Sequence, residues 1–269
     1  MRNHSMSFMV VLLTVLVLPP VAAAQTSPSF DPHDLNGIWN WASPDRGFSL
    51  DVPPMTPEGE ARFNANKPGY GTPLGSPPRP GAPVEHIGRR RAVPPAQGND
   101  PVGECNPLGM PRVLFTLGPF EFIQTKDRIL QFIEWHRVLR EIWTDGRKLP
   151  EPDRPRWYGY SVGRWEGDTF VVDSHGYDDR TWLDHFGYPH SDEMRLQERY
   201  RRFASDTLEL TVTLNDPKTY TKPWISEKKV YKLRPGTEIS EEICAPIDEV
   251  DNFNKRVRDP AGGVGGTKR

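Results

Sequence analysis

Strict alternation of apolar and polar residues is the feature that most constrains this fold. The run TLELTVTLN (207–215) places Leu208, Leu210, Val212 and Leu214 on one side of an extended chain, with Thr and Glu on the other. Successive side chains of a strand point to opposite faces of its sheet. The pattern therefore predicts a strand with one face on a core and the other in water.

Strand-like segments recur along most of the chain after Pro111, separated by short polar links that include the turn signals Asp145-Gly146 and Glu166-Gly167-Asp168. The segments are 120–124, 129–135, 138–143, 158–165, 169–177, 194–203, 207–215, 228–233 and 238–244. An additional opening strand is expected over 34–41. So many strands with almost no helix predict a mainly β protein, an antiparallel up-and-down meander that closes into a barrel or a clam-like sandwich.

The N-terminus predicts export. Arg2 is followed by a short apolar run (8–18) and by the small residues 22–24. That order is typical of a secretory signal peptide over residues 1–24, and the run is too short to span a bilayer. We expect a periplasmic or secreted protein with no stable membrane insertion after cleavage.

The rest of the chain divides by composition. Residues 25–111 hold the opening strand and a long Pro/Gly-rich arm that wraps the domain, with one short helix within 55–68. Residues 112–258 form the β core, and 259–269 form a disordered Gly-rich tail. The formal net charge of −2 gives no bias toward nucleic acid. The two cysteines, Cys105 and Cys244, predict a disulfide in an oxidising compartment.

Two strands carry charge on a face that should be buried. Glu198 shares its face with Met194, Leu196 and Tyr200, and Glu134 and His136 share theirs with Leu130 and Phe132. An inward carboxylate is costly unless it is paired or faces a wet cavity. The sequence therefore predicts one of two arrangements. Either these carboxylates lie near strand ends and reach solvent or form internal Arg–Glu pairs, or they line a polar pocket inside a barrel. Partners would come from other segments, the candidates being Arg112, Arg137, Arg140 and Arg180.

The link RTWLDHFGYPHSDE (180–193) concentrates groups that can move protons. In one interpretation His190 is a general acid or base, with Glu198 or Asp184 orienting it and His185 nearby. A structured loop and a metal site made of His185, His190 and a carboxylate are the alternatives. Substrate contacts would then come from Arg180, Arg112, Trp182, Tyr188, Glu134, His136 and Trp224.

Several catalytic motifs are absent from the sequence, and their absence argues against certain classes of reaction. The chain has no Gly-x-Ser-x-Gly elbow, no His-Glu-x-x-His and no phosphate-cradling glycine loop. Phosphoryl transfer, dinucleotide chemistry and serine hydrolysis on an α/β scaffold are therefore not expected. No cofactor is expected either.

Several motifs in combination carry a resemblance. CNPLGMPR (105–112), GRWEGDTFVVD (163–173), RTWLDHFGYPHSDE (180–193) and YTKPW (220–224), with FEFIQT and ERYRR, resemble those of a large group of uncharacterised exported bacterial β-proteins. That resemblance implies no activity. DLNGIW (34–39) is similar to the opening strand of lipocalin-like barrels. Such barrels usually bind small ligands in an internal cavity, and some have lyase, hydratase or isomerase activity.

These observations lead to two main hypotheses. The first is an exported, cofactor-independent acid–base enzyme of the lyase, hydratase, hydrolase or isomerase type, acting on a small organic substrate in a barrel pocket. The alternative is a periplasmic, lipocalin-like binding protein that holds a small molecule without chemistry. A surface-associated interaction protein is a third hypothesis.

Overall fold

The computed structural model describes residues 30–69, 92–94 and 97–244 of the chain. The predicted signal peptide (1–24), the predicted tail (259–269) and part of the Pro/Gly-rich arm (70–91 and 95–96) lie outside the described residues. The strands and helices reported below belong to the described part.

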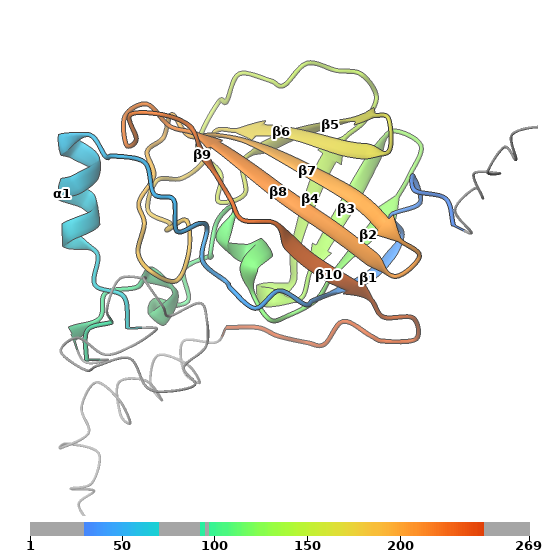
Figure 1. Cartoon of the computed structure of the whole chain (residues 1–269), viewed down its shortest axis with the longest axis horizontal. Helices are drawn as coiled ribbons and strands as arrows, with labels where there is room; N and C mark the ends of the chain where they lie inside the picture. The colour runs from blue at the N-terminus through green and yellow to red at the C-terminus, as the bar shows by residue number, and fades with distance from the viewer. Residues whose placement is uncertain (1–29, 70–91, 95–96, 245–269) are drawn as a thin grey trace, which may run out of the picture.

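One mainly antiparallel sheet forms the body of the protein (Figure 1). Its strands are β1 (Gly37–Trp41), β2 (Phe120–Gln124), β3 (Arg128–Ile133), β4 (Val138–Trp143), β5 (Tyr160–Glu166), β6 (Thr169–His175), β7 (Arg195–Ala204), β8 (Thr207–Asn215), β9 (Trp224–Ile225) and β10 (Lys229–Leu233). The helical elements are α1 (Pro57–Ala65) and three short 3-10 turns, η3 (Pro101–Glu104), η4 (Arg112–Phe115) and η5 (Trp135–Arg137).

The sheet closes into a barrel. Its strand order is β10-β1-β2-β3-β4-β5-β6-β7-β8-β9, and β10 also pairs with β8 through Leu210↔Lys229 and Leu208↔Tyr231. The closed ring therefore has nine strands, with β9 attached to β8 at its side. The predicted mainly β fold and its closure into a barrel are confirmed.

One junction of the barrel departs from the expected antiparallel meander. Strands β4 and β5 are parallel, and they pair at one position, Trp143↔Val162. The Asp-Gly signal does mark a turn, since Gly146 has φ +82°. However, the chain then continues through residues 147–159 instead of folding straight back, so β5 starts at the same end of the barrel as β4.

The core follows the alternation of the strands. Leu208, Leu210, Val212 and Leu214 are fully buried, as their spacing predicts. Aromatic side chains of other strands, including Trp39 of β1, fill the interior beside them. Burial of a large apolar side chain contributes about 1.5–3 kcal/mol, so these rows dominate the stability of the barrel.

Strand β3 presents the opposite face from the one expected. Ile129, Gln131 and Ile133 point inward, whereas Leu130 and Phe132 are only partly buried. Both faces of this strand carry large apolar residues, so alternation could not distinguish them. The polar Gln131 is tolerated inside because its Oε1 accepts a hydrogen bond from Arg140 Nη1 at 3.2 Å.

The expected inward face of Glu134 and His136 is therefore wrong. The strand ends at Ile133, and the chain turns through η5, where His136 has φ +54°. Glu134 and His136 are partly exposed at this turn. The turn brings Glu134 and Trp135 to one end of the barrel wall instead.

The short helix expected within 55–68 is confirmed as α1, which lies beside the barrel in Figure 1. Thr56 caps it by accepting a hydrogen bond from the Gly59 amide, and Pro57 occupies the first turn. The strand expected over 238–244 is absent from the described structure. This acidic, largely exposed segment follows β10 without pairing to any strand.

Candidate functional site

A cavity of about 620 Å³ opens at the end of the barrel near η4 and η5. Segments far apart in the sequence meet around it, and three of the residues expected to form a site, Arg112, Glu134 and His185, are on its wall. The remaining lining residues are Arg46, Val102, Leu108, Thr116, Leu117, Gly118, Trp135, Ser240, Glu241 and Glu242. The wall thus combines guanidinium groups, carboxylates and apolar side chains.

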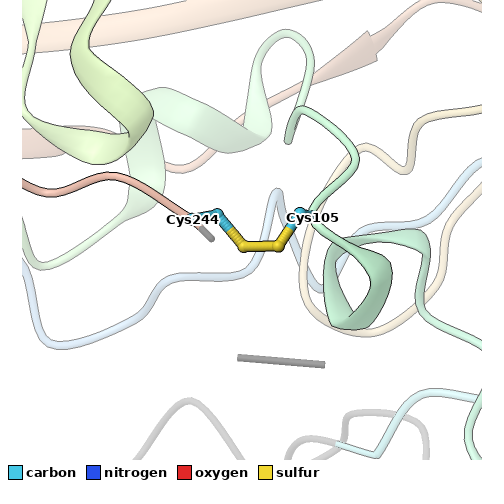
Figure 2. Close-up of a disulfide and its surroundings, with 2 residues drawn as sticks. All are labelled: Cys105 and Cys244. Atoms are coloured by element: carbon cyan, nitrogen blue, oxygen red, sulfur yellow. A yellow bond between two sulfur atoms is a disulfide. The ribbon is translucent and has the colours of Figure 1, made fainter. Parts of the chain in front are cut away.

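A disulfide holds one side of this cavity. Cys105, directly after η3, is bonded to Cys244, so the predicted pairing is confirmed (Figure 2). We call residues 240–244 the C-terminal strap. Besides the disulfide, the strap is attached by the Ser240 amide, which donates to Glu134 Oε2 at 2.9 Å, and by Arg137 Nη1, which donates to the Ser240 carbonyl at 3.1 Å.

Arg112 is the best-buried charged group of the cavity wall, with 3% of its side chain exposed. Its Nη1 and Nη2 donate to the two carboxylate oxygens of Asp100, at 2.8 and 2.5 Å. Its guanidinium also lies 5.6 Å from the ring centroid of Trp182. Such a paired and stacked arginine has a fixed orientation, as recognition of a planar ligand group requires.

The glycine of the CNPLGMPR motif brings this wall against the 180–193 segment. Gly109 has φ +70°, and a Cβ at this position would lie 2.3 Å from Thr181 Oγ1. A residue with a side chain would therefore be strained in its backbone and would clash with Thr181. The two motifs of the resemblance are in direct contact at this position.

His185 is a neutral imidazole on the cavity wall. Burial, and then the charges of Arg112 and Arg46, hold the pKa of His185 well below its ordinary value of 6.5. Arg112 Nη2 lies 3.5 Å from His185 Nδ1. A guanidinium can only donate, so a hydrogen bond in this contact runs from Arg112 Nη2 to His185 Nδ1.

His190 is fully buried and occupies a different environment. Its Nδ1 donates to the Ser191 carbonyl at 2.9 Å, and its Nε2 accepts from Thr181 Oγ1 at 2.7 Å. Burial lowers the pKa of His190 below 6.5, although the Ser191 carbonyl and nearby carboxylates oppose this. Both ring nitrogens therefore stabilise the loop.

The expected partners of His190 do not converge on it. The Asp184 carboxylate accepts hydrogen bonds from the backbone amides of Phe48 and Phe186. Glu198 lies inside the barrel and bonds Arg140 and Tyr200. The sequence predicts that His190, Asp184 and Glu198 form one proton-transfer group, but the three side chains lie in three separate environments.

Glu198 and Arg140 form a buried ion pair in the barrel interior. Arg140 Nη1 and Nη2 donate to the two oxygens of Glu198 at 2.8 and 2.7 Å, and Tyr200 donates to the same carboxylate at 2.8 Å. Ser161 accepts from Arg140 Nε at 3.1 Å. Burial alone would lower the pKa of Arg140, but the charge and hydrogen bonds of Glu198 raise it above its ordinary value. The internal Arg–Glu pair is confirmed.

The other expected contact residues are dispersed. Arg180 is 67% exposed and paired with Asp178 on the outside of the protein. Tyr188 and Trp224 are buried against each other in the core, with ring centroids 5.0 Å apart. Trp182 lies behind Arg112, so it supports the cavity wall without lining it.

Sequence reasoning missed Arg46, Trp135 and the strap residues 240–242 as parts of one site. The sequence pattern predicts one strand that contains Trp135 and another that contains residues 240–242. The predicted disulfide was the one available signal, because it implies that the chain before Cys244 lies near Cys105. No comparable signal placed Arg46 beside His185.

Within the described residues, no group of three or more His, Cys, Asp or Glu side chains is arranged to hold a metal ion. The same part of the chain has no helix long and apolar enough to cross a membrane. No protein-family model, curated protein or solved structure matches the chain.

Proposed function

We propose that the protein is an exported binding protein that holds a small organic molecule in the cavity between Arg112, Trp135 and the C-terminal strap. The observation that carries this proposal is the cavity itself. Its volume of about 620 Å³ is in the range of small-molecule sites, and its wall combines apolar side chains with a few oriented polar groups. Export is supported by the Cys105–Cys244 disulfide, which is typical of oxidising compartments.

Acid–base catalysis is a second candidate function, favoured by one observation. His185 is a neutral imidazole beside Arg112 on the cavity wall. A neutral imidazole can accept a proton, and an adjacent guanidinium can stabilise an oxyanion. In this form of the proposal His185, rather than His190, is the acid–base group.

Native mass spectrometry of the purified protein, followed by thermal-shift screening of small molecules, tests the binding proposal. We expect a ligand that raises the melting temperature and is recovered unchanged. Leu117→Trp narrows the cavity at a residue that is 65% exposed, so it should weaken binding at least about tenfold without disturbing the core.

Leu139→Trp is the matched control, because Leu139 is 58% exposed on β4 and does not line the cavity. Equal affinity of the two variants for the ligand would contradict the cavity as the binding site. Recovery of a chemically altered ligand, lost in His185→Asn, would favour the catalytic candidate instead.

A further inference from the structure

The guanidinium of Arg112 has one edge that the described protein does not use. Asp100 takes the edge formed by Nη1 and Nη2. Nε is buried and has no hydrogen-bond partner among the described residues, and the Nη2 contact to His185 is at the 3.5 Å limit of a hydrogen bond. A buried donor without a partner is unfavourable, so this edge is suited to an acceptor supplied by a ligand.

A second donor on the same wall lacks a partner. The indole Nε1 of Trp135 is buried and has no acceptor among the described residues, and Trp135 lines the cavity together with Arg112. The Nε–Nη2 edge of an arginine presents two parallel N–H groups, which match the two oxygens of a carboxylate. This edge of Arg112 indicates a carboxylate as one group of the ligand.

The acidic side of the wall favours a ligand that carries a positive charge as well as a negative one. Glu134 and Glu241 line the cavity, and of the two guanidinium groups on the wall, Arg46 and Arg112, the second is already paired with Asp100. A ligand with both an anionic group and an ammonium group would be attracted to both sides of the wall. The apolar part of the ligand would contact the apolar side chains of the cavity wall, which are Val102, Leu108 and Leu117.

We infer that the ligand is a zwitterion with an apolar body, of the class of apolar amino acids and short peptides. Its carboxylate would bind the Nε–Nη2 edge of Arg112, and its ammonium group would lie toward Glu241 and Glu134. This inference rests on the proposed binding function and specifies its ligand. A cavity of about 620 Å³ suits a molecule the size of a dipeptide.

Isothermal titration calorimetry at neutral pH, with four probes that share the same two leucine side chains, tests this assignment. The probes are dileucine, N-acetyldileucine, dileucine amide and the doubly blocked N-acetyldileucine amide. We expect dileucine to bind, and we expect either single block to weaken binding at least about tenfold, as loss of a charge-assisted hydrogen bond does.

Variants of the protein test the contacts of the ammonium group and of the carboxylate separately. Glu241→Gln changes an exposed side chain and should weaken binding of dileucine but not of N-acetyldileucine. Glu238→Gln, an exposed position of the preceding chain that does not line the cavity, is the control and should bind all probes like the wild type. Arg112→Gln should weaken dileucine but not its amide, with the melting temperature measured to verify folding.

Two results would overturn the inference, and they differ in meaning. If the doubly blocked probe binds as tightly as dileucine, or if another class of small molecule binds in the cavity while dileucine does not, the binding function stands and the zwitterion assignment is wrong. If none of the four probes and no other small molecule binds, the proposed function itself fails.

Discussion

Arg140 and Glu198 show what a single residue pattern can and cannot predict. Alternation alone places Glu198 on the buried face of β7, and the structure confirms complete burial. The partner lies 58 residues away in the sequence, and only the register of the barrel identifies it among the candidate arginines. The sequence thus predicts that a partner is needed but not which one.

Replacing one member of this pair should destabilise the protein more than replacing both members. Arg140→Met leaves Glu198 as a buried charge without its counterion, and we expect the free energy of unfolding to fall by about 3–5 kcal/mol. The double substitution Arg140→Met with Glu198→Met should recover most of that loss. Urea-induced unfolding of the three proteins measures both effects.

Arg147→Met is the matched control, because Arg147 pairs with Asp145 at the surface. It should change the free energy of unfolding by less than about 1 kcal/mol. If the double variant were as unstable as Arg140→Met alone, unfavourable packing rather than the unpaired charge would explain the loss.

At the scale of elements, the C-terminal strap is the part of the site most dependent on one bond. It has no strand partner, and the disulfide joins it to Cys105 across a sequence separation of 139 residues. Two hydrogen bonds of Ser240 attach it to the turn at η5. The acidic side of the cavity therefore depends on the oxidised state of the cysteines.

Cys105→Ser with Cys244→Ser should destabilise the protein and weaken its ligand binding together. We expect about 2–5 kcal/mol of lost stability, because the unfolded chain gains freedom when the link is removed. Thermal unfolding and ligand titration, each with and without reductant, provide the measurement. Reductant should have no effect on the double variant, and an unchanged affinity in that variant would show that the strap does not form part of the binding wall.

At the scale of the whole molecule, buried neutral histidines make stability depend on pH. Burial lowers the pKa of His190, and it lowers that of His185 as well, below the ordinary value of 6.5. Below that pH the unfolded chain binds protons that the folded protein does not bind. The stability that these groups provide is therefore present above pH 6.5 and is lost as the pH falls.

We expect the free energy of unfolding to decrease between pH 7.5 and 5.5, by up to about 1.4 kcal/mol per pH unit for each histidine. His190→Asn should reduce this slope. Thr181→Val removes the hydroxyl partner but keeps the imidazole, so it should lower stability at every pH and retain the slope. Denaturant unfolding across this pH range tests the expectation, and a wild-type profile that is flat would contradict it.

The fold was more predictable than the site. Strand-like patterns predict most of the strands, although they also predict one over 238–244 that the described structure lacks and miss β9, and the capping residues Thr56 and Pro57 predict α1. The face of β3 was ambiguous because its two faces are similarly apolar. The cavity brings together Arg112, Glu134 and His185, each of which is a candidate site residue by its chemistry. Their proximity could not be predicted, because it depends on how the turns and the strap meet after the barrel closes.

The junction of β4 and β5 has a consequence for how the barrel could open. Backbone pairing there is confined to Trp143↔Val162, whereas Arg140 of β4 bonds Ser161 of β5 and Glu198 of β7 from within. Side-chain hydrogen bonds therefore hold β4 and β5 together where few backbone hydrogen bonds do. A local opening that admits water to the barrel interior without global unfolding would break the fewest backbone hydrogen bonds between these two strands.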